Sequence, residues 1–235
     1  MQIDNSSPII KNVEGKMIYI LGNIILVQFI YPITESNSVL SLIVYQLLYA
    51  TLFGSGMMLT QYNPRLVKSL AVLGVIWLVD ILSTYVSNQT AVEALIIAYF
   101  AYEALILIIT AILFKYVFRA RNITRDVLFA AIAIYLLLGA VFIPVYGLIE
   151  SLTFALSGQH AFTGGQLVNG FFAWQDFNYY SYVTLTTLGY GDILPVTMLA
   201  KVAVSIEAII GVMYLTIIMA RLVSLYSADI NQPTE

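Results

Sequence analysis

The chain has 235 residues, of which 60% are hydrophobic and only 10% are charged, whereas soluble domains carry about 25% charged residues. This composition excludes a single soluble globule and predicts a protein of the lipid bilayer. The net charge of -3 offers no basic surplus for nucleic-acid phosphates. There is no cysteine and one histidine, His160, which argues against disulfides, cysteine or histidine metal sites and Ser-His-Asp catalysis.

Six apolar stretches are long enough to cross a hydrocarbon core of roughly 30 Å, which takes about 20 helical residues. Polar, turn-forming clusters separate them. The stretches are Met17 to Ile33, Val39 to Leu59, Val67 to Val86, Ala94 to Phe114, Val127 to Ile149 and Leu199 to Leu225. The predicted fold is an all-α membrane protein with six transmembrane helices, organised as a four-span bundle over residues 1–123 and a second domain over residues 124–235.

The basic residues indicate the orientation of these spans, because Lys and Arg near short loops stay on the cytoplasmic side. Nine of them fall on one side: Lys11, Lys16, Arg65, Lys68, Lys115, Arg119, Arg121, Arg125 and Arg221. Only Lys201 opposes them. Both termini are therefore predicted to be cytoplasmic, in an integral protein of the plasma membrane. The basic linker formed by Lys115, Arg119, Arg121 and Arg125 is either a topology anchor or a site for anionic lipid.

The first four spans contain two acids with no basic residue nearby in sequence, Asp80 and Glu103. An ionisable group inside a span is costly and marks a candidate functional site. Either each acid is uncharged and hydrogen-bonded to a tyrosine such as Tyr45 or Tyr102, or the pair senses protons or cations. Between Ala94 and Phe114 there is no Lys or Arg, so steep voltage gating by moving basic charges is not expected.

The segment between spans five and six, from Glu150 to Met198, is predicted to face outward and contains an apolar stretch too short to cross. Asp176 is expected to cap a helix running from about Phe177 to Thr186. The glycine-rich residues that follow should break this helix. A helix of about ten residues in this position predicts a re-entrant half-helix.

The half-helix leads into Thr184-Leu185-Thr186-Thr187-Leu188-Gly189-Tyr190-Gly191-Asp192, which resembles the selectivity filter of the tetrameric potassium-channel family. The resemblance extends from Asp126 to about Tyr226. It implies a homotetramer in which residues 124–235 supply an outer helix, a pore helix, a filter and an inner helix. It further implies that K⁺ binds at the carbonyls of Thr187, Leu188, Gly189 and Tyr190 and at the Thr187 hydroxyl, with Thr184, Thr186 and Asp192 as filter support.

The backbone of this motif is suited to cation binding for a physical reason. A strand whose carbonyls all point inward supplies rings of oxygens when four chains meet on one axis. Such a strand needs some residues at positive φ, which Gly189 and Gly191 adopt without a Cβ clash. Two departures from the family pattern are Val183, where some members carry glutamate, and the pair Tyr179 and Tyr180, where many carry tryptophan.

Span six carries the remaining candidate residues. Gly211 lies twenty positions after Gly191, where the resemblance implies a gating hinge; close helix packing is the alternative. Helical spacing from Gly211 predicts that cavity or gate residues come from Tyr214, Leu215, Ile218 and Leu222. Glu207 is expected either behind the pore helix, accepting hydrogen bonds from Ser181 or Thr184, or in the cavity as a ring of negative charge.

The sequence thus predicts a potassium-selective channel that conducts passively, without a cofactor or chemical step, in contact with membrane lipids. The alternatives are a weakly selective cation channel and a non-conducting regulatory membrane subunit. A membrane-embedded enzyme built on Asp80, Glu103 and Glu207 is disfavoured, since three acids without a nucleophile motif or metal-ligand spacing form no recognisable site.

Overall fold

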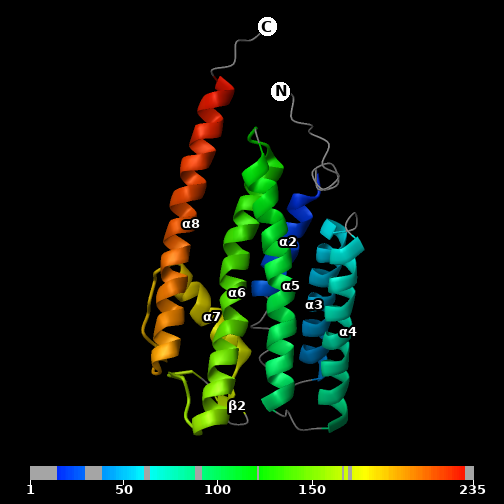
Figure 1. Cartoon of the computed structure of the whole chain (residues 1–235), viewed down its shortest axis with the longest axis vertical. Coiled ribbons are helices and arrows are strands. Elements are labelled where there is room, and N and C mark those ends of the chain that lie inside the picture. Colours follow the sequence, from blue (N-terminus) through cyan, green and yellow to red (C-terminus); the bar gives the residue numbers. More distant parts are fainter. Residues whose placement is uncertain are drawn as a thin grey trace.

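The structure, a computed structural model, describes residues 15–29, 39–60, 64–87, 92–120, 122–165, 167–168 and 171–230, and it is mostly helical (Figure 1). Its helices are α2 (Met17–Phe29), α3 (Val39–Thr60), α4 (Pro64–Ser87), α5 (Val92–Arg119), α6 (Arg125–Ser157), α7 (Trp174–Leu185) and α8 (Met198–Ile230). Its strands are β1 (Phe162–Thr163), β2 (Leu167–Val168), β3 (Phe171–Phe172) and β4 (Leu194–Pro195).

Each predicted span overlaps a helix. Helices α6 and α8 have 33 residues each, which corresponds to about 50 Å at the helical rise. Both are long and apolar enough to cross a membrane, and they flank the pore region. Helices α3, α4 and α5 have 22, 24 and 28 residues. Helix α2 ends at Phe29, and the rest of the predicted first span lies outside the described residues. The count of six spans stays a prediction.

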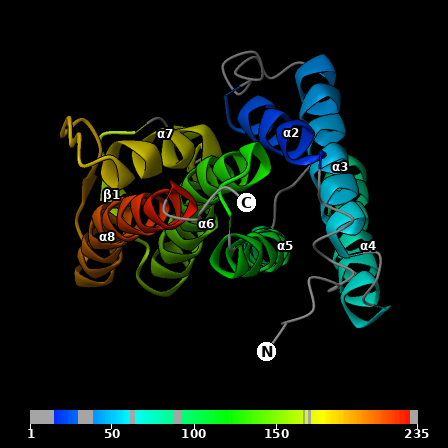
Figure 2. The ribbon, with the colours of Figure 1, turned by 90° about the horizontal axis from the view of Figure 1, so that it is seen from above.

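The long helices run side by side and alternate in direction (Figure 1). Seen from above, α6, α7 and α8 form one group, α2, α3 and α4 lie on the other side, and α5 packs along α6 between them (Figure 2). The core lies mainly where α5 meets α6, with Leu105, Ile109, Leu113, Ala130, Ile134 and Leu137 buried. Small residues on α6 let the two backbones approach closely.

Except for Lys201 near the start of α8, the basic residues of the described helices lie toward one end of this arrangement. The C-terminal ends of α3, α5 and α8 and the N-terminal ends of α4 and α6 all lie at the upper end in Figure 1. Helix α6 begins there at an N-cap, Thr124, whose hydroxyl accepts a hydrogen bond from the Val127 amide at 3.3 Å. Only five residues separate α5 from α6, so no further helix lies between the predicted bundle and the predicted pore.

The prediction that Asp176 caps the half-helix is wrong. Helix α7 begins at Trp174, its N-cap is Ala173, and no side chain caps it. Asp176 lies inside the first turn, where its carboxylate faces the positive end of the helix dipole but does not end the helix. The expected capping residue lies three positions after the actual N-cap, Ala173.

Candidate ion-conduction site

Helix α7 is fixed on α6 by hydroxyl groups that donate to carbonyls of the longer helix. Ser181 Oγ donates to the carbonyl oxygen of Gly139 at 2.7 Å, and the Tyr182 hydroxyl donates to that of Leu136 at 2.9 Å. Ser181 is fully buried. Because α7 lies between α6 and α8 and contacts both, its C-terminal end is held at a defined place, and the filter residues begin there.

The backbone after α7 alternates between two conformations. Thr187, Gly189 and Gly191 have φ of 58°, 56° and 80°, and the residues between them do not have positive φ. The two glycines adopt the positive φ expected of them. Thr187 was not expected to do so, since a left-handed conformation costs a non-glycine residue roughly 1–2 kcal/mol. A strained non-glycine residue of this kind is typical of functional sites.

Hydrogen bonds turn the amides of this strand toward the pore helix. The Thr187 amide donates to the Thr184 carbonyl at 2.9 Å, and the Leu188 amide donates to the Val183 carbonyl at 2.9 Å. Among the described residues, no hydrogen bond ends on the carbonyl oxygens of residues 187–190. The strand therefore uses its amides for its own support and leaves its carbonyls available as ligands for a cation.

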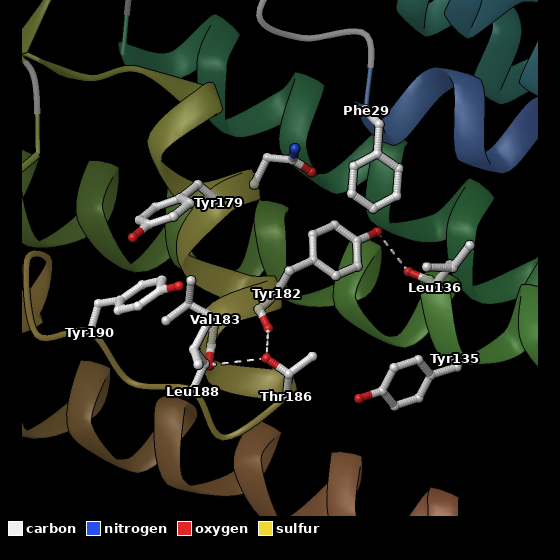
Figure 3. A pocket seen from close by; sticks show the side chains of 10 residues that line it. Phe29, Tyr135, Leu136, Tyr179, Tyr182, Val183, Thr186, Leu188 and Tyr190 are labelled. Carbon is white, nitrogen blue, oxygen red and sulfur yellow. Dashed lines mark hydrogen bonds between the residues drawn. The ribbon is translucent and has the colours of Figure 1, made fainter.

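Two side chains of the filter strand are exposed to solvent in the single chain. Leu188 and Tyr190 are 55% and 67% exposed. Both line a mostly apolar cavity of about 360 Å³, into which Tyr179 and Tyr182 also project (Figure 3). A second hollow of about 300 Å³ includes Thr187, Gly189, Gly191, Tyr180 and Val204 in its lining. One chain thus leaves its filter strand open on two sides.

The strand ends at Asp192, whose Oδ2 accepts a hydrogen bond from the Tyr179 hydroxyl at 2.7 Å. This bond holds the pKa of the exposed Asp192 carboxyl below its usual value. Tyr179 is one of the residues that depart from the family pattern, yet it supplies a donor to the outer end of the filter. The pore helix and the end of the filter strand are joined by this contact.

Glu207 of α8 lies behind the pore helix, the first of the two placements considered. It is fully buried. Its Oε1 lies 2.5 Å from Ser181 Oγ, whose single proton is shared with the Gly139 carbonyl, and its Oε2 accepts a hydrogen bond from the Tyr146 hydroxyl. Glu207 therefore connects the inner helix, the pore helix and the outer helix. Tyr146, also fully buried, was missed by the sequence analysis, because nothing in its local pattern shows which helix face it occupies.

Gly211 lies where α8 passes the C-terminal end of the pore helix. A Cβ there would collide with the carbonyl oxygen of Leu185, so the glycine permits close approach of two backbones. Helix α8 runs without a break from Met198 to Ile230. Close packing is thus observed at Gly211, and its role as a hinge stays a prediction.

The candidate gate residues do not share one open face. The Tyr214 hydroxyl donates to the carbonyl oxygen of Ala131 on α6 at 2.6 Å, and both Tyr214 and Ile218 are buried. These two residues are turned toward α6, so the interpretation that they line the pore does not fit their placement. Leu215 is 46% exposed and Leu222 is half-buried, which leaves them as the candidates.

Arg221 forms a contact that the sequence analysis did not identify. Its Nη2 donates to the carbonyl oxygens of Val117, Phe118 and Ala120 at 3.3, 2.8 and 2.9 Å. Its guanidinium also lies 5.2 Å from the centroid of the Phe118 ring. The last carbonyls of a helix have no partner within the helix, so Arg221 of α8 caps the C-terminal end of α5.

The remaining candidates lie apart from this site. Glu103 Oε2 is buried and has no hydrogen-bond partner in the described residues. The side chains of Asp80, Tyr45 and Tyr102 fall outside the described part, as does Arg121. Lys115, Arg119 and Arg125 are exposed. Within the described ranges no group of three or more acids and histidines could hold a metal ion.

Comparison with known proteins adds one finding to this geometry. Residues 130–228 match the family model described as an ion channel. They form an ion-channel pore domain. The match begins within α6, includes α7 and the filter strand, and ends near the end of α8, and it covers less than half of the chain. It confirms the prediction of a channel rather than an enzyme. No curated protein and no solved structure matches the chain.

Proposed function

We propose that this protein is a potassium-selective channel that assembles as a homotetramer and conducts K⁺ passively across the plasma membrane. The observation that carries the proposal is the filter backbone. Positive φ at Thr187, Gly189 and Gly191 turns successive carbonyls to one side of the strand, and amide bonds to the pore helix hold it there. Rings of such carbonyls replace the hydration shell of a K⁺ ion.

The exposure of the filter strand supports an assembly of several copies. One strand supplies one oxygen to each ring, so a closed cage requires several strands around an axis. The exposed side chains of Leu188 and Tyr190 would be covered by neighbouring copies. Four chains of 26.1 kDa give an assembly of about 104 kDa, and rotation around one axis closes such a ring.

In this proposal residues 124–235 form the pore domain, and residues 1–123 form a bundle that regulates it. Thr184, Thr186, Asp192 and Glu207 support the filter. The bundle is not a steep voltage sensor, because the described fourth helix, α5, carries no basic residue between Ala94 and Phe114. Both termini are placed in the cytoplasm, on the side of the basic residues.

Ion flux through the purified protein in liposomes tests this function. We expect K⁺ flux to exceed Na⁺ flux and to be blocked by Ba²⁺. Gly189→Ala is the informative variant, because a Cβ at this position meets nothing within 4 Å but the residue has φ +56°. Within one chain space is therefore available, whereas the backbone conformation is disfavoured for alanine, so the variant should lose discrimination between K⁺ and Na⁺.

Gly54→Ala is the matched control, since a Cβ there also meets nothing within 4 Å and the residue lies inside helix α3. It should conduct as the wild type does. Equal K⁺ and Na⁺ flux through the wild type would instead indicate a weakly selective cation channel. A wild type without flux would indicate a regulatory subunit that does not conduct.

A further inference from the structure

A buried carboxylate organises the loop that follows the outer helix. Helix α6 ends with Gly158 in the left-handed conformation, and the chain turns back along the helix. Glu150, only 2% exposed, then meets the loop: its Oε2 accepts hydrogen bonds from the amides of Ala161 and Phe162 at 2.7 and 3.3 Å. Two backbone donors on one carboxylate oxygen fix the position of this loop relative to α6.

The same loop holds the segment that follows the filter. The Ala161 carbonyl accepts a hydrogen bond from the Val196 amide at 2.8 Å, and β1 pairs antiparallel with β4. Gly164 lies so close to the Asp192 carbonyl oxygen that a Cβ would collide with it. Asp192 comes directly after the filter residue Gly191. A continuous set of backbone contacts therefore connects Glu150 to the outer end of the filter.

His160 contacts the second oxygen of the Glu150 carboxylate. Its Nδ1 is hydrogen-bonded to Glu150 Oε1, and its ring lies between those of Phe154 and Phe172, with centroids at 5.2 and 5.6 Å. The side chain of His160 is 30% exposed, so a proton can reach it from water. It is the only histidine of the chain, and histidine is the side chain that ordinarily changes charge between pH 5 and 8.

Resting on the proposed function, we propose that His160 and Glu150 form a proton-responsive clamp that positions the outer end of the filter. When the imidazole takes up a proton from the outer solution, its contact with the Glu150 carboxylate becomes an ion pair. The loop is then held more firmly on α6, and β1 holds β4 and the filter end more firmly. Acid on the outer side therefore stabilises the conducting filter.

Other charged groups near this clamp do not contact the imidazole. The elements packed on the loop carry Asp176 on α7, Asp192 after the filter and Lys201 on α8. Among the described residues, the polar contact of His160 is with Glu150 alone. The proposed response to protons is therefore assigned to the contact of His160 with Glu150.

Single-channel recording in a planar bilayer, with the pH varied on one side only, tests the clamp. From outer pH 8 to 5.5 we expect open bursts of the wild type to lengthen about two- to fivefold, the range of a partly exposed ion pair. His160→Gln keeps a neutral donor, so its open bursts should keep the wild-type length at pH 8 over the whole pH range. His160→Arg carries a permanent charge, so its open bursts should keep the wild-type length at pH 5.5 over the whole pH range. Gln159→Ala, at an exposed neighbouring position, should keep the wild-type profile.

A second measurement reports on the clamp without ion flux. In the wild type, the hydrogen-exchange rates of the Ala161 and Val196 amides, after correction for the intrinsic pH dependence, should be lower at pH 6 than at pH 8. The difference should vanish in His160→Gln. A wild type whose bursts and amide protection are both independent of pH, or a Gln variant that keeps the wild-type profile, would overturn the clamp. A wild type that does not select K⁺ but whose amide protection depends on pH would overturn the proposed function. The proposed clamp would then still stand.

Discussion

Removing the Tyr146 hydroxyl tests whether the contact behind the pore helix stabilises the protein. Tyr146→Phe keeps the ring, which packs against Phe162 and Tyr180 with centroids at 5.4 and 5.3 Å. It leaves Glu207 Oε2 without its donor in a fully buried position. A buried polar atom left without a partner costs about 1–3 kcal/mol, so the free energy of unfolding should fall by that amount.

A double-mutant cycle separates this contact from general loss of packing. In a Glu207→Leu background the Tyr146 hydroxyl has lost its carboxylate acceptor, so removing it there should no longer destabilise the protein, because a buried hydroxyl without that partner is itself unfavourable. Tyr214→Phe is the control. That hydroxyl donates to a backbone carbonyl of α6 rather than to Glu207, so its cost should be the same in both backgrounds.

Thermal unfolding of the protein in lipid nanodiscs measures these differences, with a shift of about 2–4 °C per kcal/mol for a chain of this size. Single-channel recording of Tyr146→Phe should show a less stable open filter at an unchanged unitary conductance, because the contact lies behind the pore helix. Equal costs of Tyr146→Phe with glutamate and with leucine at position 207, within about 0.5 kcal/mol, would refute the reasoning.

Three further changes have expected outcomes. Gly211→Ala should lower stability by about 1–3 kcal/mol, because its Cβ meets the backbone of the pore helix, whereas Gly54→Ala should not lower it in the same unfolding assay, since alanine is the better helix former. Tyr179→Phe should lower the melting temperature at pH 7. The Tyr179 hydroxyl holds the pKa of Asp192 below its usual value, so its contribution is fully present above that usual value, and the difference from wild type should shrink as the pH falls through the lowered pKa. Arg221→Gln should change the ratio of open to closed channels about tenfold, since hydrogen bonds to a charged group contribute roughly 1.5–3 kcal/mol; an unchanged ratio in bilayer recordings would contradict the role of this contact.

The course of the helices could be predicted because it depends on local quantities. Apolar length and polar interruptions place a helix at each predicted span, although α6 continues eight residues past its expected end at Ile149 and α7 starts earlier than its expected cap. The conformation of the filter was predictable at Gly189 and Gly191, where glycine is the residue that tolerates positive φ. The positive φ of Thr187 was not, because threonine disfavours it and only hydrogen bonds to the pore helix stabilise it.

The contacts that support the site depend on which face each helix turns to its neighbours. Tyr146 and Glu207 are separated by 61 positions, and Arg221 and Val117 by 104. Helical periodicity gives the relative direction of side chains on one helix but not the rotation of two helices against each other. For the same reason Tyr214 and Ile218 were assigned to the pore face, although hydrogen bonding and burial turn them toward α6.

Besides the packing of α5 on α6, hydrogen bonds connect the bundle to the pore domain at two separate places, and these two contacts differ in strength. Near the filter, the Asn178 amide of α7 donates to the Gln28 carbonyl of α2 at 3.0 Å, and Phe29 stacks on Tyr182 with centroids 5.7 Å apart. At the second place, the guanidinium of Arg221 makes hydrogen bonds to two of the last carbonyls of α5 and to that of Ala120, which follows the helix. Hydrogen bonds from a charged donor are roughly twice as strong as neutral ones, so a movement of the bundle should act more on the inner helix than on the filter.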